Sequence, residues 1–187
     1  KKNFKELIQL QILEPLNEIK LSKTIKSLGS INDEVSQKVK SQYEENPYPR
    51  WRYGNHSENQ KVSIVQRINN EINPSYISKT LGDDQLKVLI AGCGTGQQIL
   101  HTQILKNAQV TCIDLSLSSL SYAQRKINEI GIKNVNLFQM DILEVSSLKE
   151  QFDIIECCGV LHHMADPQQG LKALLDIFNP KGFMKLS

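Results

Sequence analysis

The stretch from residue 87 to residue 96 constrains the fold of this chain most. After Lys87, an apolar run over residues 88–91 is typical of a buried strand, and it leads directly into the turn Gly92-Cys93-Gly94-Thr95-Gly96. Closely spaced glycines allow a tight turn and let a ligand approach the main chain, and the start of a following helix exposes amides that favour a negative group. The stretch therefore predicts a strand, a ligand-binding turn and a helix in succession.

From this point the sequence alternates between short apolar runs and helical segments. This is the pattern of parallel strands that are joined by helices. Strands are predicted over 87–91, 108–114, 135–140 and 152–158, with a fifth beginning at 183, and helices over 97–106, 118–130 and 167–178. We therefore expect an α/β fold, a Rossmann-like, doubly wound and mostly parallel sheet with helices on both faces.

The N-terminal part has a helical pattern instead. Leucines and isoleucines recur at helical spacing until Pro15, where we expect the first helix to end or kink. A second helix is expected to begin with Asn32 or Asp33 as its N-cap and to stop before Asn46. A third helical pattern covers residues 62–72.

An aromatic linker with Tyr48 and Trp51 follows the second helix. It could cover a ligand, or it could anchor the N-terminal helices to the sheet. We favour anchoring, because large aromatic side chains usually serve packing. We thus divide the chain into a helical N-terminal segment with this linker, residues 1–60, and a Rossmann-like domain, residues 61–187, that is incomplete at its C-terminus.

The composition is that of a globular chain. Hydrophobic residues make up 40% of the 187 residues, and 22 basic against 20 acidic residues give a formal net charge of only +2, which does not favour nucleic acid as a partner. The sequence has no run of 18 apolar residues and no secretory signal, so we expect no membrane association and a cytoplasmic protein. The four cysteines match no disulfide framework and no common zinc motif, so we expect no metal.

The second predicted strand ends in an acid, Asp114. The carboxyl ends of parallel strands lie at one edge of the sheet, where a carboxylate can accept hydrogen bonds from both hydroxyls of a ribose; otherwise Asp114 would be a turn or N-cap residue. With the glycine turn it predicts a nucleoside site. The turn reads G-x-G-x-G, whereas the dinucleotide fingerprint needs its third glycine where Gln97 stands, which disfavours a nicotinamide cofactor.

Three motifs together resemble class I S-adenosylmethionine-dependent methyltransferases. They are the strand and glycine turn over residues 88–96, the acids Asp114 and Asp141, and the segment at 160–164, Val-Leu-His-His-Met. The resemblance covers residues 80–187. It implies S-adenosyl-L-methionine as cofactor and transfer of its methyl group to a small-molecule or protein acceptor.

The resemblance also implies which residues hold this cofactor. The glycine turn would wrap the methionine part and the ribose, and Asp114 would hold the ribose hydroxyls. Asp141 would accept a hydrogen bond from the adenine amino group, and Ile142 would pack on the ring; Asp141 could instead simply cap a helix. The full set of predicted cofactor residues is Ala91, Gly92, Cys93, Gly94, Gly96, Asp114, Leu115, Asp141, Ile142 and Cys157.

The segment after the fourth predicted strand faces the acceptor in such enzymes. It lacks the Asn/Asp-Pro-Pro-Tyr motif of enzymes that methylate nucleobase amino groups, and it has Glu156 alone where arginine-methylating enzymes have two glutamates. His162 is a weak candidate for a catalytic base, because a neutral imidazole can accept a proton. Adjacent side chains diverge, so at most one of His162 and His163 should face the site. We expect Cys157 and Cys158 to be packing residues rather than nucleophiles.

Two alternatives to a methyltransferase stay open. One is a non-catalytic cofactor-binding or interaction module, because the sequence stops at Ser187 in an apolar run and sheets of this kind usually continue. The other is an NAD-dependent oxidoreductase. Residues 42–51 resemble a segment that precedes methyltransferase domains in proteins with tetratricopeptide repeats, which agrees with a piece of a longer chain. The sequence specifies neither the acceptor nor the oligomeric state.

Overall fold

The computed structural model describes residues 2–54, 61–78 and 85–187. The N-terminal part contains α1 (Lys2–Ile8), a π-helical turn η1 (Gln9–Leu13), α2 (Glu14–Ser22), β1 (Lys26–Ser27) and α3 (Glu34–Glu45). The rest contains α4 (Ile64–Ile72), β2 (Leu86–Ala91), α5 (Ile99–Thr102), β3 (Ala108–Asp114), α6 (Leu117–Ile130), β4 (Val135–Gln139), η2 (Ile142–Leu148), β5 (Phe152–Cys157), η3 (Leu161–His163), α7 (Pro167–Asp176) and β6 (Phe178–Leu186). Among these described residues, no helix is long and apolar enough to cross a membrane.

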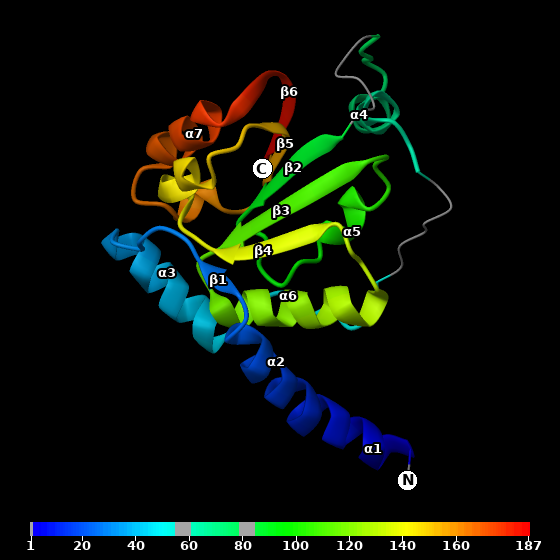
Figure 1. The fold of residues 1–187 in the computed structure, drawn as a ribbon, viewed down its shortest axis with the longest axis vertical. Helices are drawn as coiled ribbons and strands as arrows, with labels where there is room; N and C mark the ends of the chain where they lie inside the picture. Colours follow the sequence, from blue (N-terminus) through cyan, green and yellow to red (C-terminus); the bar gives the residue numbers. More distant parts are fainter. Residues whose placement is uncertain (1, 55–60, 79–84) are drawn as a thin grey trace.

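The six strands form one sheet in the order β1-β4-β3-β2-β5-β6, and every neighbouring pair is parallel (Figure 1). The chain runs outward from β2 through β3 to β4, and then returns to the other side of β2 to form β5 and β6. The predicted Rossmann-like, doubly wound sheet is thereby confirmed. In such sheets ligands bind at the carboxyl ends of the strands, where the direction of winding changes, and that point lies at the end of β2.

The two faces of the sheet have separate hydrophobic cores. Along β2, Val88 and Ile90 belong to one core, while Leu89 and Ala91 belong to the other, as the alternation of a strand requires. Helices α4, α5 and α6 contribute to the first core, and η2 and α7 contribute to the second. Since both faces are covered, β2 is buried on both sides and places the following turn rigidly.

The N-terminal helices form an arm that extends from the body of the protein (Figure 1). Of the two outcomes expected at Pro15, an end or a kink, the helical segment does not end there: the π-helical turn η1 precedes Pro15, which lies in the first turn of α2. Helix α3 begins as predicted, because the side chain of Asp33 accepts a hydrogen bond from the amide of Ser36.

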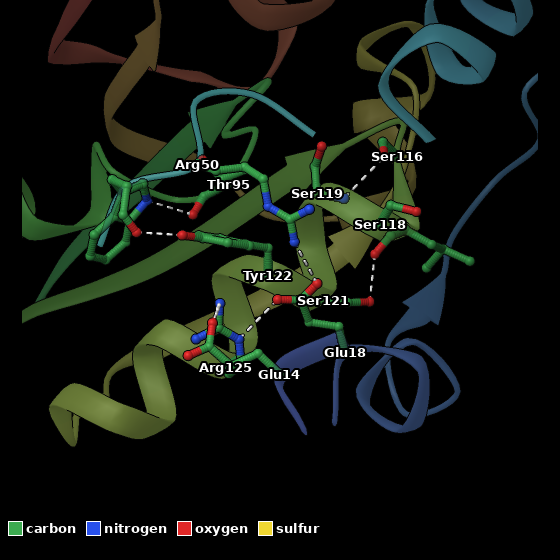
Figure 2. A network of polar contacts seen from close by, with 12 residues as sticks. Glu14, Glu18, Arg50, Thr95, Ser116, Ser118, Ser119, Ser121, Tyr122 and Arg125 are labelled. Carbon is green, nitrogen blue, oxygen red and sulfur yellow. Dashed lines mark hydrogen bonds and ion pairs between the residues drawn. The ribbon is translucent and has the colours of Figure 1, made fainter. Parts of the chain in front are cut away.

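Buried charges attach this arm to α6 (Figure 2). The guanidinium of Arg125 lies 2.9 Å from Glu18 and 3.1 Å from Glu14, both on α2, and Glu18 also contacts Arg50 at 2.9 Å. The ring of Tyr122 lies between Arg50 and Arg125. The distance from its centroid is 5.1 Å to the guanidinium carbon of Arg50 and 4.7 Å to that of Arg125. The arm, the aromatic linker and α6 are thus held by one network.

Three elements differ from the sequence prediction. Strand β1 was not predicted, because its two residues are exposed and have no apolar pattern; its pairing with β4 includes a 2.6 Å hydrogen bond from Ser27 Oγ to Gln139 Oε1. Helix α5 ends at Thr102 rather than near 106. Strand β6 begins at Phe178, where the sequence predicted the end of a helix, because Phe178 pairs with Phe152 of β5.

Candidate functional site

A cavity of about 430 Å³ opens at the carboxyl ends of β2, β3, β4 and β5. Its wall comes from the glycine turn, the ends of β3 and β4, the segment after β5, the aromatic linker and, unexpectedly, α3. The volume lies within the range of small-molecule sites in proteins, which is about 300–1,000 Å³. The cavity therefore occupies the position at which doubly wound sheets bind their ligands.

The glycine turn is fixed to the neighbouring strand β3. The amides of Gly92 and Cys93 both donate to the carbonyl of Ile113, at 2.9 and 3.0 Å. Gly92 has a φ of +73°, and a Cβ at this position would lie 2.4 Å from Cγ2 of Val160. Glycine is therefore required here both by the backbone conformation and by the close approach of the segment after β5.

Asp114 connects this turn to the start of α6. Its Oδ2 accepts a hydrogen bond from the amide of Gly94 at 2.8 Å, and its Oδ1 accepts one from the amide of Ser116 at 2.9 Å. A carboxylate has about four acceptor positions, so both oxygens can accept further hydrogen bonds from a ligand. The turn and the acid are thus direct neighbours on one wall of the cavity, as the sequence predicted.

Asp141 serves as a helix cap and also lines the cavity. Its Oδ1 accepts a hydrogen bond from the amide of Leu143 at 3.0 Å, which caps η2, and its side chain is buried. Both Asp141 and the adjacent Ile142 line the cavity. The structural and the ligand-binding interpretations of Asp141 are therefore compatible.

Helix α3, from the N-terminal part of the chain, forms part of the cavity wall. Ser36, Val39 and Tyr43 contribute to this wall. The carboxylate of Glu44 fixes this helix, because it accepts hydrogen bonds from the amides of Leu117 and Ser118 at 2.7 and 3.0 Å and thereby caps α6. Sequence reasoning missed these residues, and helical spacing alone gave no signal that this face meets a distant ligand site.

The residues of the aromatic linker divide between anchoring contacts and the wall of the cavity. Trp51 is an anchor: it is buried, and its indole Nε1 donates to the carbonyl of Thr95 at 3.0 Å, while the hydroxyl of Tyr122 donates to the carbonyl of Trp51. Tyr48 and Pro49 instead line the cavity. Tyr48 and Pro49 also lie against the glycine turn: a Cβ on Gly94 would lie 3.1 Å from the carbonyl oxygen of Tyr48, and the hydroxyl of Thr95 donates to the carbonyl of Pro49.

Seven of the ten predicted cofactor residues line the cavity, and three do not. The three are Ala91, Gly96 and Cys157. Ala91 is buried in the core. Gly96 allows close packing of α6, because a Cβ there would lie 2.8 Å from Cβ of Ala123. The seven that line it are Gly92, Cys93, Gly94, Asp114, Leu115, Asp141 and Ile142.

Cys157 lies in the core at the end of β5. Burial raises the pKa of its thiol to about 12, so the thiol is protonated at neutral pH. A protonated thiol is a poor nucleophile. The adjacent Cys158, rather than Cys157, lines the cavity.

The two histidines of η3 both line the cavity. Their ring centroids are 4.0 Å apart, with an angle of 46° between the planes. The expectation that at most one of His162 and His163 faces the site was therefore wrong. It assumed an extended segment, in which adjacent side chains point to opposite sides, whereas the segment forms a 3₁₀ turn.

Glu156 does not line the cavity, because it is engaged elsewhere. Its Oε1 lies 2.8 Å from Nη2 of Arg67 on α4, and the two side chains are only 6% and 9% exposed. Arg67 also donates to the carbonyl of His101. Glu156 therefore stabilises the packing of α4 on the sheet. Within the described ranges, no group of three His, Cys, Asp or Glu side chains is placed to hold a metal ion.

These observations define a class of protein: a Rossmann-like α/β domain with a cavity of small-molecule size at the carboxyl edge of its sheet. A profile described as "Methyltransferase domain" matches residues 88–182, more than half of the chain. The chain therefore belongs to this methyltransferase domain family.

Two relatives are similar to part of the chain. An uncharacterised protein of a Synechococcus strain is 36% identical over 102 residues, which are 54% of this chain and 24% of that protein. A ubiquinone biosynthesis O-methyltransferase of Pseudomonas savastanoi is 31% identical over 116 residues, 60% of this chain and 49% of that enzyme. The chain thus spans half or less of the length of these two relatives.

A solved structure that contains AdoHcy is similar to part of the chain. It is PKMT2 of Rickettsia typhi in complex with AdoHcy, with 27% sequence identity and a TM-score of 0.52. The match covers 57% of this chain and 21% of that one.

Proposed function

We propose that this chain binds S-adenosyl-L-methionine in the cavity and transfers its methyl group to a small-molecule or protein acceptor. The observation that carries the proposal is the junction of the glycine turn with Asp114, joined by the 2.8 Å hydrogen bond from Gly94, beside an open cavity. Family membership and the AdoHcy complex of PKMT2 support it. A rigid site of this kind accelerates transfer mainly by holding two reactants in line, which can lower a barrier by about 7–11 kcal/mol.

The residues of the cavity suit the parts of this cofactor. The carboxylate of Asp114 can accept hydrogen bonds from ribose hydroxyls, and Asp141 with Ile142 offers an acceptor and an apolar surface for the adenine. Once bound, the cofactor supplies an electrophilic methyl group on its sulfonium. The protein's own task is then to orient the cofactor and to exclude water, and α3 with Tyr48 closes the cavity on the side away from the sheet.

Calorimetry with S-adenosylhomocysteine and with NAD tests the choice of cofactor. We expect S-adenosylhomocysteine to bind and NAD not to bind, because Gln97 stands where a dinucleotide site needs glycine. Binding of NAD alone would contradict the proposal. Release of S-adenosylhomocysteine by the full-length protein with hydroxyl or amine acceptors distinguishes an enzyme from a non-catalytic module.

The pH dependence of binding gives a second test. Burial raises the pKa of Asp114 above its ordinary value of 3.8, although hydrogen bonds from the amides of Ser116 and Gly94 oppose this shift. A protonated carboxyl group accepts hydrogen bonds less well than a carboxylate. The affinity for S-adenosylhomocysteine should therefore fall as the pH is lowered through the raised pKa of Asp114. The stability of the ligand-free protein depends on pH in the opposite direction. Because the pKa of Asp114 is raised in the folded state, the free energy of unfolding falls as the pH rises from 3.8 through the raised pKa. Calorimetry at several pH values measures the first effect.

His162 is proposed as the base that accepts the acceptor's proton, and this role rests on its position in the wall of the cavity. We expect His162→Gln to lower kcat about tenfold and to leave the affinity for S-adenosylhomocysteine unchanged, because the sulfonium is already reactive and proton removal is secondary. His163→Gln is the matched control. Equal losses in both variants would contradict a specific role for His162.

We also propose that the protein acts in the cytoplasm. All four cysteines of the chain are free thiols, as expected in a reducing compartment. Fractionation of cells that express the full-length protein tests this proposal.

A further inference from the structure

One hydroxyl at the start of α6 differs from its neighbours. The Oγ of Ser116 accepts a hydrogen bond from the amide of Ser119 at 3.0 Å, and the Oγ of Ser118 donates to Glu44 at 2.6 Å. The Oγ of Ser121 donates to a main-chain carbonyl of the same helix at 2.6 Å. The hydroxyl of Ser119 has no hydrogen-bond partner, although Ser119 is completely buried (Figure 2).

The unpartnered hydroxyl belongs to the wall of the cavity. Buried polar atoms in native proteins nearly always have a hydrogen-bond partner, so an exception calls for an explanation. Of the side chains that the structure describes, two have a buried oxygen without a partner, Ser119 Oγ and Gln98 Oε1. Both residues line this same cavity. We therefore infer that a polar ligand in the cavity supplies the hydrogen-bond partners of these two oxygens.

Ser119 lies beside the predicted ribose site. Asp114 accepts a hydrogen bond from the amide of Ser116, and Ser116 in turn accepts one from the amide of Ser119. A carboxylate can only accept hydrogen bonds, whereas a serine hydroxyl both donates and accepts. Each of two adjacent ligand hydroxyls can donate and accept a hydrogen bond. Asp114 can accept from these hydroxyls, and Ser119 can in addition donate to one of them, so the two residues together satisfy the hydroxyl pair better than either does alone.

We propose that the Ser119 hydroxyl is a specificity-determining group that binds a ribose hydroxyl of the cofactor together with Asp114. The inference rests on the proposed function. It adds a residue that the glycine turn and the acid do not include, and it explains why a serine with no internal partner is completely buried at this position.

The test is calorimetry on the whole chain with S-adenosylhomocysteine and its 2′-deoxy and 3′-deoxy analogues. We expect Ser119→Ala to lower the affinity for S-adenosylhomocysteine about threefold to tenfold, the usual net effect of one hydrogen bond. The same substitution should not weaken binding of the analogue that lacks the contacted hydroxyl. Ser121→Ala is the matched control, because Ser121 is equally buried but its hydroxyl bonds within the helix, and its affinity should equal that of the wild type.

Thermal unfolding without ligand provides an independent readout. Ser119→Ala should keep or raise the midpoint, because it removes a buried hydroxyl without a partner, whereas a merely structural role would lower it. If the alanine variant does not fold, Ser119→Cys keeps a similar size with a weak donor and should repeat the loss of affinity.

Two results would overturn the inference. One is wild-type affinity in Ser119→Ala, and the other is an equal loss of affinity for all three ligands. If the wild-type chain itself fails to bind S-adenosylhomocysteine, the proposed function is wrong. The two failures are therefore distinguishable.

Discussion

Substitution of Asp114 by asparagine is expected to weaken the binding of S-adenosylhomocysteine at least about 100-fold. The variant would lack the charge-assisted hydrogen bonds that the carboxylate of Asp114 accepts from two ribose hydroxyls, each worth about 1.5–3 kcal/mol. In addition, an amide group has only one oxygen, whereas the amides of Gly94 and Ser116 need an acceptor on each side. Isothermal titration calorimetry measures the change in affinity.

Asp153→Asn is the matched control for this variant. Asp153 lies near the start of β5, does not line the cavity, and also accepts a main-chain hydrogen bond, from the amide of Lys87 at 2.9 Å. It should therefore change stability but leave ligand affinity unchanged. Wild-type affinity in Asp114→Asn would remove the basis of the proposed nucleoside site.

The second large effect is expected on stability. Arg67→Met should lower the free energy of unfolding by about 3–5 kcal/mol, because it leaves the buried carboxylate of Glu156 without its partner at 2.8 Å. Denaturation by guanidinium chloride measures this loss. The double variant Arg67→Met with Glu156→Leu should recover most of it, since no unpaired buried charge remains.

An exposed pair provides the comparison. Lys87 and Glu150 lie 2.9 Å apart but are 46% and 48% exposed, so Lys87→Met should cost less than about 1 kcal/mol. A similar loss in both variants would show that burial does not determine the contribution of these pairs. The Arg67 pair also explains why Glu156 is absent from the cavity wall.

The sequence was sufficient for the core of the fold because the parallel strands are buried on both faces. The buried strands β2 and β3 are rich in apolar residues, with the run Val88 to Ala91 in β2, and a single glycine, Gly131, ends α6 with a φ of +85°. The short and exposed β1 has no such pattern, and neither does the start of β6 at Phe178. Both exist because a neighbouring strand offers unpaired main-chain groups.

The candidate site divides in the same way. Gly92, Gly94, Asp114 and Asp141 could be predicted, since each follows directly from the end of a strand, and strand ends of a parallel sheet meet at one edge. Ser119 could not be predicted, because its significance depends on the absence of a partner. The pairing of His162 with His163 depends on a 3₁₀ turn that the sequence does not indicate.

By itself, then, the sequence determined the parallel sheet, the glycine turn and the acid beside it, because local conformation and strand direction bring these together over short distances along the chain. Only the tertiary structure decided what encloses the site. Helix α3 and Tyr48 lie far from the sheet residues in sequence, and they reach the cavity because Glu44 caps α6 and Trp51 is anchored at Thr95. Contacts of this kind depend on three-dimensional geometry, which no periodicity along the chain encodes.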